Sequence, residues 1–497
     1  MQLRLTAEQA RRLREHLFGA DGRERFAYLR CTATGDRLVT SHVDLVGDED
    51  MATMTATECR PALDVERGIV AECTGDGLAP IMVHSHPFAD EAAFSERDEA
   101  LMQKYYTWLR GLYPDLGFGF IVAARDEAVL RWFPANSDEQ ATHPAIRSVG
   151  SWYFPETDGF HPANDDREVT VDGERYDRSI RCLGPDGQQR LADTRVVVAG
   201  VGGLGSHIAE QLARLGVGHL TVIDPDIVEE SNLPRIVGAA PHHVGRPKVD
   251  VAKEAIYRAN PDAEVYTVQG RIEDHENRVA GADIVVAALD EAGATSVLNQ
   301  QCVAYLSTLV ETGTRIDTGD DGDLEAMTGI IQTVEPGVTA CYDCLERGQN
   351  RESRLEGLPE EYAHEDIDRG YVDAGILEPE PAITTLNLTV AGLTCQTVLK
   401  LRTGYAEPGC FIRYDGLTDE TRRSLTTPNP ECATCGNNGI LGHGGNPELT
   451  ADTEGLDLDM DFAENGEDEQ EGRPTDERPQ YWGEWFDNGL FQVFEGQ

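Results

Sequence analysis

In the second half of the chain, short apolar runs alternate with longer stretches in which apolar residues recur every three or four positions. A short apolar run between polar or glycine residues is typical of a buried strand, and the longer period is typical of a helix packed against it. Strands and helices in regular succession predict an α/β fold with a mostly parallel, doubly wound sheet. The predicted strand–helix pairs are 195–199 with 204–215, 220–224 with 248–258, and 284–288 with 294–306, followed by a long helix over 383–402.

The first part of the chain has a more mixed pattern. Thr6 precedes a helical stretch that ends near residue 18, so its side chain is placed to cap that helix. A second helix is predicted over 95–112. Apolar runs of strand length surround it and predict a smaller α/β unit that ends near residue 135. These predicted strands are 25–31, 38–46, 80–84, 117–123 and 128–133.

Changes in composition divide the chain into four segments. Residues 136–170 are rich in Pro, Asn, Asp, Ser and Gly without a sustained period, which predicts a linker. Residues 441–497 are strongly acidic, and we expect this tail to be largely disordered. Aromatic residues gather near its end, as a docking peptide or as a segment that folds back on the core. The expected domains are therefore an α/β unit at 1–135 and a larger one at 171–440.

The formal net charge is −47, and the acidic residues are spread over the whole chain. This distribution argues against a nucleic-acid surface, which needs a basic face. It favours a halophilic protein that stays soluble in concentrated salt, with a merely acidic protein as the alternative. No apolar run is long enough for a membrane helix, and no apolar signal core follows the start. We therefore expect a cytoplasmic protein, whose 11 cysteines are metal ligands or free thiols.

A pair of histidines stands at the end of the predicted strand 80–84. His84 and His86 are two positions apart, so their rings point to the same face of an extended chain. Asp98, near the start of the next helix, can supply a third ligand, and this set leaves one position of a tetrahedral zinc ion open, as catalysis requires. Ser95 could donate to the oxyanion of a tetrahedral intermediate. The alternative is two core histidines and a serine that caps a helix.

The His-Ser-His-Pro motif, followed at this spacing by Ser95 and Asp98, resembles the JAB (JAMM or MPN) family of zinc isopeptidases. The resemblance implies a JAB-type α/β domain with a catalytic zinc ion held by the two histidines and Asp98. The family also has a glutamate at the head of its first strand, and here Glu24 opens the matching segment Glu-Arg-Phe-Ala-Tyr-Leu. Glu24 then takes the role of general base. A degenerate, metal-free version of the fold stays as an alternative.

A glycine-rich turn separates the predicted strand 195–199 from the helix that follows it. Such a turn lets main-chain N–H groups approach a phosphate at the helix N-terminus. The glycines alone also fit a dinucleotide site, with Asp224 about 20 residues on for a ribose hydroxyl. The glycines of this turn are Gly200, Gly202, Gly203 and Gly205.

Polar and cationic residues downstream of the turn favour a site for a nucleoside triphosphate over a site for a dinucleotide. Asn232, Arg235 and Lys248 lie where a triphosphate would need neutralising, and a nicotinamide enzyme has no use for them. Asp290 follows the predicted strand 284–288, so it reaches the carboxyl edge of the sheet, where it is suited to Mg²⁺.

From about residue 175 to 436 these features resemble the ThiF/MoeB/HesA family, the prokaryotic relatives of ubiquitin-activating enzymes. The resemblance implies a Rossmann-like activating-enzyme fold that adenylates a C-terminal carboxylate with ATP and Mg²⁺. Arg178 matches an arginine that reaches the neighbouring protomer's nucleotide site, which implies a homodimer. Asp290, Arg235 and Lys248 take catalytic roles. The ATP-binding residues implied are Gly200, Gly202, Gly203, Gly205, Asp224, Asn232, Arg235, Lys248, Arg178 and Asp290.

Two Cys-x-x-Cys pairs, Cys341 with Cys344 and Cys432 with Cys435, are a strong signal for a structural zinc ion. The same family carries this pair of knuckles. Relatives that form a thioester have a cysteine after the first knuckle, but none occurs here from 345 to 394.

Together these motifs predict a bifunctional enzyme acting on the C-terminus of a ubiquitin-like partner. One half would trim or deconjugate the partner with zinc, and the other would adenylate its terminal glycine. Alternatively, the partner is a ThiS/MoaD-like sulfur carrier in cofactor or cysteine biosynthesis, or the JAB-like domain only docks the partner. A conjugating-enzyme-like protein or a sulfur donor would then receive the activated group.

Overall fold

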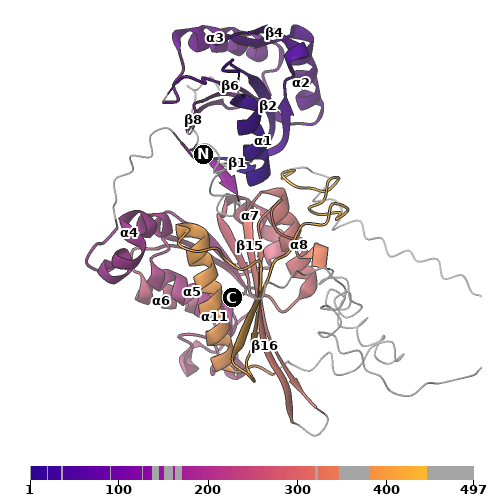
Figure 1. The fold of residues 1–497 in the computed structure, drawn as a ribbon. Helices are drawn as coiled ribbons and strands as arrows, with labels where there is room; N and C mark the ends of the chain where they lie inside the picture. Colours follow the sequence, from indigo (N-terminus) through magenta and orange to yellow (C-terminus); the bar gives the residue numbers. More distant parts are fainter. Residues whose placement is uncertain are drawn as a thin grey trace, which may run out of the picture.

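The computed structural model describes residues 2–136 except 20, 35–36, 90 and 126, and then 145–149, 161–162, 171–319, 323–345 and 381–444. These residues form two eight-stranded sheets and a small two-stranded ribbon. The two large sheets belong to the two halves of the molecule, one above the other in Figure 1. The predicted acidic tail lies outside the described residues from 445 onwards.

The N-terminal sheet has the strand order β10-β8-β7-β6-β2-β3-β1-β9. Its central strand β2 pairs antiparallel with both β3 and β6, and β6 pairs parallel with β7. The strands are β1 (Gln2–Thr6), β2 (Phe26–Thr34), β3 (Arg37–Leu45), β6 (Ala79–Ser85), β7 (Phe118–Ala123), β8 (Glu127–Phe133), β9 (Ala145–Val149) and β10 (His161–Pro162), with the ribbon β4 (Met51–Met54) and β5 (Cys59–Pro61) beside them.

Three helices accompany this sheet: α1 (Ala7–Leu17), α2 (Leu63–Gly75) and α3 (Glu96–Leu112). Thr6 caps α1 as expected, because its side chain accepts from the main-chain N–H of Gln9. The sequence did not predict α2. The segment predicted as a linker also differs from expectation, since β9 pairs with β1 and β10 pairs with β8. The strand β9 forms because pairing with β1 buries Ile146, which is 6% exposed, in the core of this sheet.

The C-terminal sheet has the order β13-β12-β11-β14-β15-β16-β17-β18. Its first five strands are parallel and follow the Rossmann order 3-2-1-4-5, which creates a switch point between β11 and β14. The last three strands are antiparallel. The strands are β11 (Arg195–Ala199), β12 (His219–Ile223), β13 (Glu264–Val268), β14 (Ile284–Ala287), β15 (Thr308–Thr318), β16 (Leu324–Val334), β17 (Phe411–Asp415) and β18 (Glu420–Ser424).

Helices cover both faces of this sheet, as a doubly wound fold requires. Val196 and Val198 of β11 pack into a core cluster shared with α5, α6 and α11, whereas Val197 and Ala199 pack into another with α7 and α8. Successive strand side chains point to opposite faces, so a continuous apolar strand supplies both cores. The helices are α4 (Asp177–Ala192), α5 (Gly205–Leu215), α6 (Lys248–Ala259), α7 (Glu276–Gly281), α8 (Ala292–Ala304) and α11 (Thr384–Thr403).

Two buried arginines join the two halves. Arg4 of β1 is 1% exposed, and its guanidinium donates to the carbonyl oxygens of Ala282, Tyr305 and Leu306 and to Ser307 Oγ. These acceptors lie beyond the C-terminal ends of α7 and α8, where helix dipoles favour a cation. We call this contact the arginine clasp.

The second arginine of the clasp is Arg37 of β3. It donates to the carbonyl oxygen of Gly281 at 2.7 Å, and its Nη2 lies 3.6 Å from Asp283 Oδ1. The same carboxylate oxygen lies 3.5 Å from Arg4 Nη2. Asp283 thus pairs with both buried cations, carbonyl oxygens supply their other acceptors, and the two halves meet through a paired, hydrogen-bonded joint.

A short segment after the last cysteine also crosses between the halves. The N–H groups of Gly442 and Gly444 donate to the carbonyl oxygens of Val303 and Ala304 at the end of α8. A Cβ atom on Gly442 would lie 2.4 Å from the carbonyl oxygen of Thr40, in β3. The segment therefore touches both halves at once.

Candidate functional site

The glycine-rich turn lies at the switch point, directly after β11. Gly200 has φ +83°, and a Cβ there would lie 2.4 Å from the carbonyl oxygen of Ala288. A Cβ on Gly205 would lie 1.8 Å from the carbonyl oxygen of Gly200. Both positions therefore require glycine for steric reasons. By contrast, a Cβ on Gly202 would meet no described atom within 4 Å, so this part of the turn faces open space.

Asp224, directly after β12, ties its strand to the turn. Its two carboxylate oxygens accept hydrogen bonds from the main-chain N–H groups of Val201, at 2.8 Å, and Asp226, at 2.9 Å. Burial raises the pKa of Asp224, although Lys248 and the two N–H groups act in the opposite direction. The carboxylate thus shapes the turn, and its predicted contact with a ribose stays a prediction.

The predicted cations reach this site from two sides. The stem of Arg235 lies against the turn, because a Cβ on Gly203 would lie 2.9 Å from Arg235 Cδ. Lys248 opens α6, and its Nζ pairs with Asp226 Oδ2 at 2.7 Å. Both cations are therefore near the carboxyl ends of β11 and β12, where an anionic ligand of this fold binds.

The structure places the other predicted ATP-site residues in three different settings. Asn232 is 6% exposed, and its Oδ1 accepts from the N–H of Glu229, so it holds the local turn in shape. Asp290 is exposed beyond β14, at the carboxyl edge where the sequence predicted it. Arg178 is exposed on α4, and its predicted role needs a second protomer.

Sequence reasoning missed one residue of this site, Asn387 near the start of α11. A Cβ on Gly203 would lie 2.7 Å from Asn387 Nδ2. The sequence signal is a single asparagine in the first half of a helix that is otherwise apolar and threonine-rich there, which by itself points to no site.

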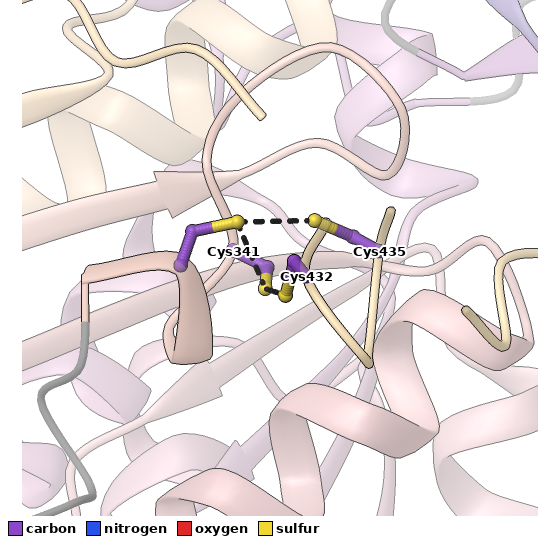
Figure 2. A group of neighbouring side chains, drawn as sticks. Cys341, Cys432 and Cys435 are labelled. Carbon is purple, nitrogen blue, oxygen red and sulfur yellow. Dashed lines mark hydrogen bonds between the residues drawn. The ribbon is translucent and has the colours of Figure 1, made fainter. Parts of the chain in front are cut away.

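The four cysteines form one cluster, as predicted (Figure 2). The sulfur separations are 3.7 Å for Cys341–Cys344, 3.7 Å for Cys341–Cys432 and 3.2 Å for Cys344–Cys435. Zn–S bonds of about 2.3 Å in a tetrahedron give separations of about 3.8 Å, so the cluster fits a zinc ion. Hydrogen bonds from Cys341 and Cys435 lower the pKa of Cys344, whereas the pKa values of Cys341 and Cys435 are raised, so among these three sulfur atoms Cys344 carries the charge without a metal.

Asp343 is not one of the four cysteine ligands, but its carboxylate holds the two Cys-x-x-Cys segments together. Its carboxylate accepts from Thr434 Oγ1 at 2.6 Å in the second knuckle. It also accepts from Ser296 Oγ and Asn299 Nδ2, both on α8. The cluster is therefore built into the core of its domain, because its ligand loops are fixed to a central helix.

In the N-terminal half, the two histidines and Asp98 also converge. His84 Nε2 lies 3.0 Å from Asp98 Oδ1, and His86 Nε2 lies 3.4 Å from Asp98 Oδ2. Metal–ligand bonds of about 2.0–2.2 Å give ligand separations of about 3.4 Å, so this set fits a zinc ion as well. Burial opposes ionisation of Asp98, but hydrogen bonds from the two imidazoles outweigh it and hold its pKa far below the ordinary range.

Glu24 and Ser95 flank this cluster in different ways. Glu24 is 9% exposed, and burial raises its pKa while the two imidazoles act in the opposite direction. A carboxylate with a raised pKa is a better proton acceptor near neutral pH. Ser95 caps α3, since its Oγ accepts from the N–H of Asp98 and its own N–H donates to Asp98 Oδ2. The part of the alternative that makes Ser95 a helix cap is thus confirmed, and the hydroxyl proton is not used by the cap.

In the described ranges no helix is long and apolar enough to cross a membrane.

Residues 176–434, just over half of the chain, match the model of the ThiF family. The chain is 32% identical over 270 residues to the molybdopterin-synthase adenylyltransferase of Escherichia coli K12, covering 53% of this chain and 96% of that protein. It is 33% identical over 274 residues to the SAMP-activating enzyme E1 of Haloferax volcanii, covering 54% and 90%. It is 29% identical over 267 residues to the sulfur carrier protein ThiS adenylyltransferase of E. coli K12, covering 53% and 94%. This chain therefore belongs to the ThiF family, through an adenylyltransferase-type domain at residues 176–434.

Proposed function

We propose that the C-terminal domain adenylates the C-terminal carboxylate of a small ubiquitin-like or sulfur-carrier protein. One observation carries this proposal: the glycine-rich turn lies at the switch point with Arg235 and Lys248 beside it. Open space next to Gly202 and two nearby cations suit the triphosphate of ATP. The family match supports the same chemistry.

In the reaction, a carboxylate oxygen of the partner attacks the α-phosphorus of ATP. The bond from that phosphorus to the bridging oxygen of pyrophosphate breaks, so an acyl-adenylate and pyrophosphate result. Arg235 and Lys248 neutralise charge that shifts to the leaving group, and the turn's N–H groups orient the phosphates. Mg²⁺, when bound, supplies charge neutralisation, and Asp290 is the carboxylate that would hold it.

The partner follows from what the relatives' names say. By their names, these relatives act on or with molybdopterin synthase, SAMP and the sulfur carrier ThiS. We propose a partner of this kind with a C-terminal glycine, and transfer of the activated group either to a conjugation target or to a sulfur donor. Arg178, exposed on α4, would complete the nucleotide site of a second copy in a homodimer.

ATP–pyrophosphate exchange in high salt tests adenylation directly. Wild type and Asp290→Ala would each be offered the small ubiquitin-fold proteins with C-terminal Gly-Gly from the same genome. We expect exchange with one partner and its loss in the variant. Absence of exchange with every processed partner would overturn the proposal. Trapping the product with a sulfur donor or with lysine-bearing proteins then distinguishes sulfur transfer from conjugation.

For the N-terminal half, we propose a second activity as a zinc-dependent peptidase that cleaves after the partner's terminal glycine. The observation that favours it is the cluster of His84, His86 and Asp98 beside the buried Glu24. Zinc, when bound, supplies Lewis acidity toward a carbonyl oxygen and water. Glu24 accepts the proton of the attacking water and passes it to the leaving amine, while Ser95 donates to the developing oxyanion.

A partner carrying a short C-terminal extension tests this activity. We expect wild type to release the extension, and Glu24→Gln to retain zinc without cleaving. Metal content distinguishes an active peptidase from a domain that only docks the partner. Two zinc ions per chain would support the active site, and one would support docking. Cleavage that persists in Glu24→Gln would contradict its role as general base.

A further inference from the structure

The helix α11 begins beside the glycine-rich turn, although it follows the turn by almost two hundred residues. His207 Nε2 in α5 lies 3.3 Å from Thr384 Oγ1 in the first turn of α11. The two helices pack side by side along one face of the sheet (Figure 1). Polar side chains at the start of α11 can therefore reach whatever the turn holds.

Asn387 is the polar side chain that points there. It is 3% exposed, and its Nδ2 would lie 2.7 Å from a Cβ on Gly203. Because Gly203 has no side chain, the amide nitrogen lies directly against the main chain of the turn. Arg235 approaches the same glycine, with Cδ at 2.9 Å from that Cβ position. A neutral donor and a cation thus flank one point of the turn.

Thr314 of β15 fixes which end of the amide faces the turn. Its Oγ1 donates to Asn387 Oδ1 at 3.0 Å, so the oxygen end is held toward the sheet. The nitrogen end, with its two N–H donors, is then directed away from the sheet. Among the residues that the structure describes, the hydrogen bond of this side chain is the one made by Oδ1. The residue is 3% exposed, but its Nδ2 is not among the fully buried polar atoms without a partner, so a ligand at the turn can reach these donors.

We infer that the side-chain amide of Asn387 donates a hydrogen bond to an anionic oxygen of the ligand held at the glycine-rich turn. This inference rests on the proposed adenylation and adds a ligand-binding residue to it. The phosphate oxygens of ATP and the carboxylate oxygen of the incoming partner share this chemistry. Thr314 acts through Asn387 by holding the amide in the donating orientation.

The chain offers a matched control two residues from Thr314. Thr312 Oγ1 lies 3.0 Å from Thr394 Oγ1, so this pair joins the same strand and helix without facing the turn. Thr312→Val and Thr314→Val remove one buried or half-buried hydroxyl each from one interface. A purely structural role for Thr314 predicts the same outcome for both variants.

The test measures equilibrium binding of a fluorescent ATP analogue and the constants of pyrophosphate exchange, with melting temperatures alongside. We expect Asn387→Ala to weaken ATP binding about ten- to a hundredfold, as loss of a hydrogen bond to a charged group does. Asn387→Asp keeps the shape but presents a carboxylate to the ligand, and we expect it to bind still more weakly. Thr314→Val should weaken binding severalfold, whereas Thr312→Val should bind like wild type.

The two sources of anionic oxygen give different patterns. If Asn387 contacts a phosphate, ATP affinity falls without the partner present. If it contacts the partner's carboxylate, ATP affinity holds and the KM for the partner rises in exchange. Unchanged values of both in Asn387→Ala, or equal losses in Thr312→Val and Thr314→Val, would overturn the inference. Absence of ATP binding by wild type would instead overturn the proposed adenylation, and this inference with it.

Discussion

The two candidate metal clusters, one in each half, differ in the number and the origin of their ligands. The cysteine cluster offers four sulfur atoms from segments that are far apart in the chain, and Cys341 and Cys435 are part of the domain's core. The histidine cluster offers three ligands from β6, the residues after it and the first turn of α3. Four ligands close a tetrahedral ion, whereas three leave one position for a reactant.

We therefore expect the cysteine cluster to support the stability of the chain and the histidine cluster to support its activity. Damage to the cysteine cluster should unfold the domain whose core it belongs to. Damage to the histidine cluster should abolish chemistry and leave the fold in place. The arginine clasp lies between the two halves and determines whether they respond together. Four variants, in order of expected effect, test this separation.

The largest effect is expected for Cys435→Ser. The change removes a ligand of a closed site, and loss of a structural metal is among the few single changes that cost about 4 kcal/mol or more of the free energy of unfolding. Melting temperature and zinc content by mass spectrometry are the measurements. Cys182→Ser, at an exposed thiol outside both clusters, is the control and should match wild type. An unchanged melting temperature would remove the structural role from this cluster.

Arg4→Ala should have the next largest effect. It takes the cationic donor from three carbonyl oxygens and leaves Asp283 to pair with Arg37, and breaking a buried pair in this way costs about 3–5 kcal/mol. We expect the two halves to melt in two separate transitions, with faster hydrogen exchange in β1 and β3. Arg11→Ala, in an exposed pair with Glu8, should change stability by about 1 kcal/mol at most. A single transition at the wild-type temperature would contradict the clasp.

His86→Ala is expected to lower zinc content by one ion per chain while changing the melting temperature little. Its ring is half-buried at the edge of its domain, so few contacts are lost. Cleavage of an extended partner should stop, while pyrophosphate exchange continues. His219→Ala, at a partly exposed histidine of the other half, is the control. Loss of both zinc ions in His86→Ala would mean that the clusters are not independent.

The smallest effect concerns the charge of Glu24, measured in the His86→Ala background to exclude metal. Burial raises the pKa of Glu24, so the folded state holds its proton more tightly than the unfolded state. The free energy of unfolding therefore falls as the pH rises from the unfolded-state pKa of Glu24 to its folded-state pKa. Glu24→Gln has no ionisable group there and removes this loss. We expect a small gain in melting temperature near pH 7.5 that shrinks as the pH falls toward the ordinary pKa of glutamate, about 4.3. A gain of equal size at both pH values would contradict this origin.

The clusters could be predicted from sequence because their ligands follow short-range rules. His84 and His86 lie on one face by strand geometry, and each Cys-x-x-Cys pair is a local turn. Three of the five parallel strands, β11, β12 and β14, were predictable for the same reason, since buried strands read as continuous apolar runs, whereas β13 and β15 were not predicted. Gly200 and Gly205 marked their turn correctly, because only glycine fits the close approaches found there.

What the sequence did not predict depends on contacts between distant segments. The antiparallel strands β16 to β18 carry mixed patterns, such as the exposed Arg422 and Arg423 of β18. Each of them pairs with the strand before it, beginning at β15. Arg4 looks like an ordinary charged residue of a strand, and only the second domain explains its burial. Asn387 belongs to the site because Thr314 and Gly203 meet it in space.

The arginine clasp also bears on how such a two-part protein could arise. Arg4 is held mostly by main-chain carbonyl oxygens beyond the ends of α7 and α8, and these are present whatever side chains surround them. A domain that brings one arginine on a strand near the edge of its sheet can therefore dock onto an existing sheet without a tailored partner surface. After a gene fusion, the interface between the two domains would need few further substitutions to become rigid. The sequences of the two halves could then diverge while the interface persisted.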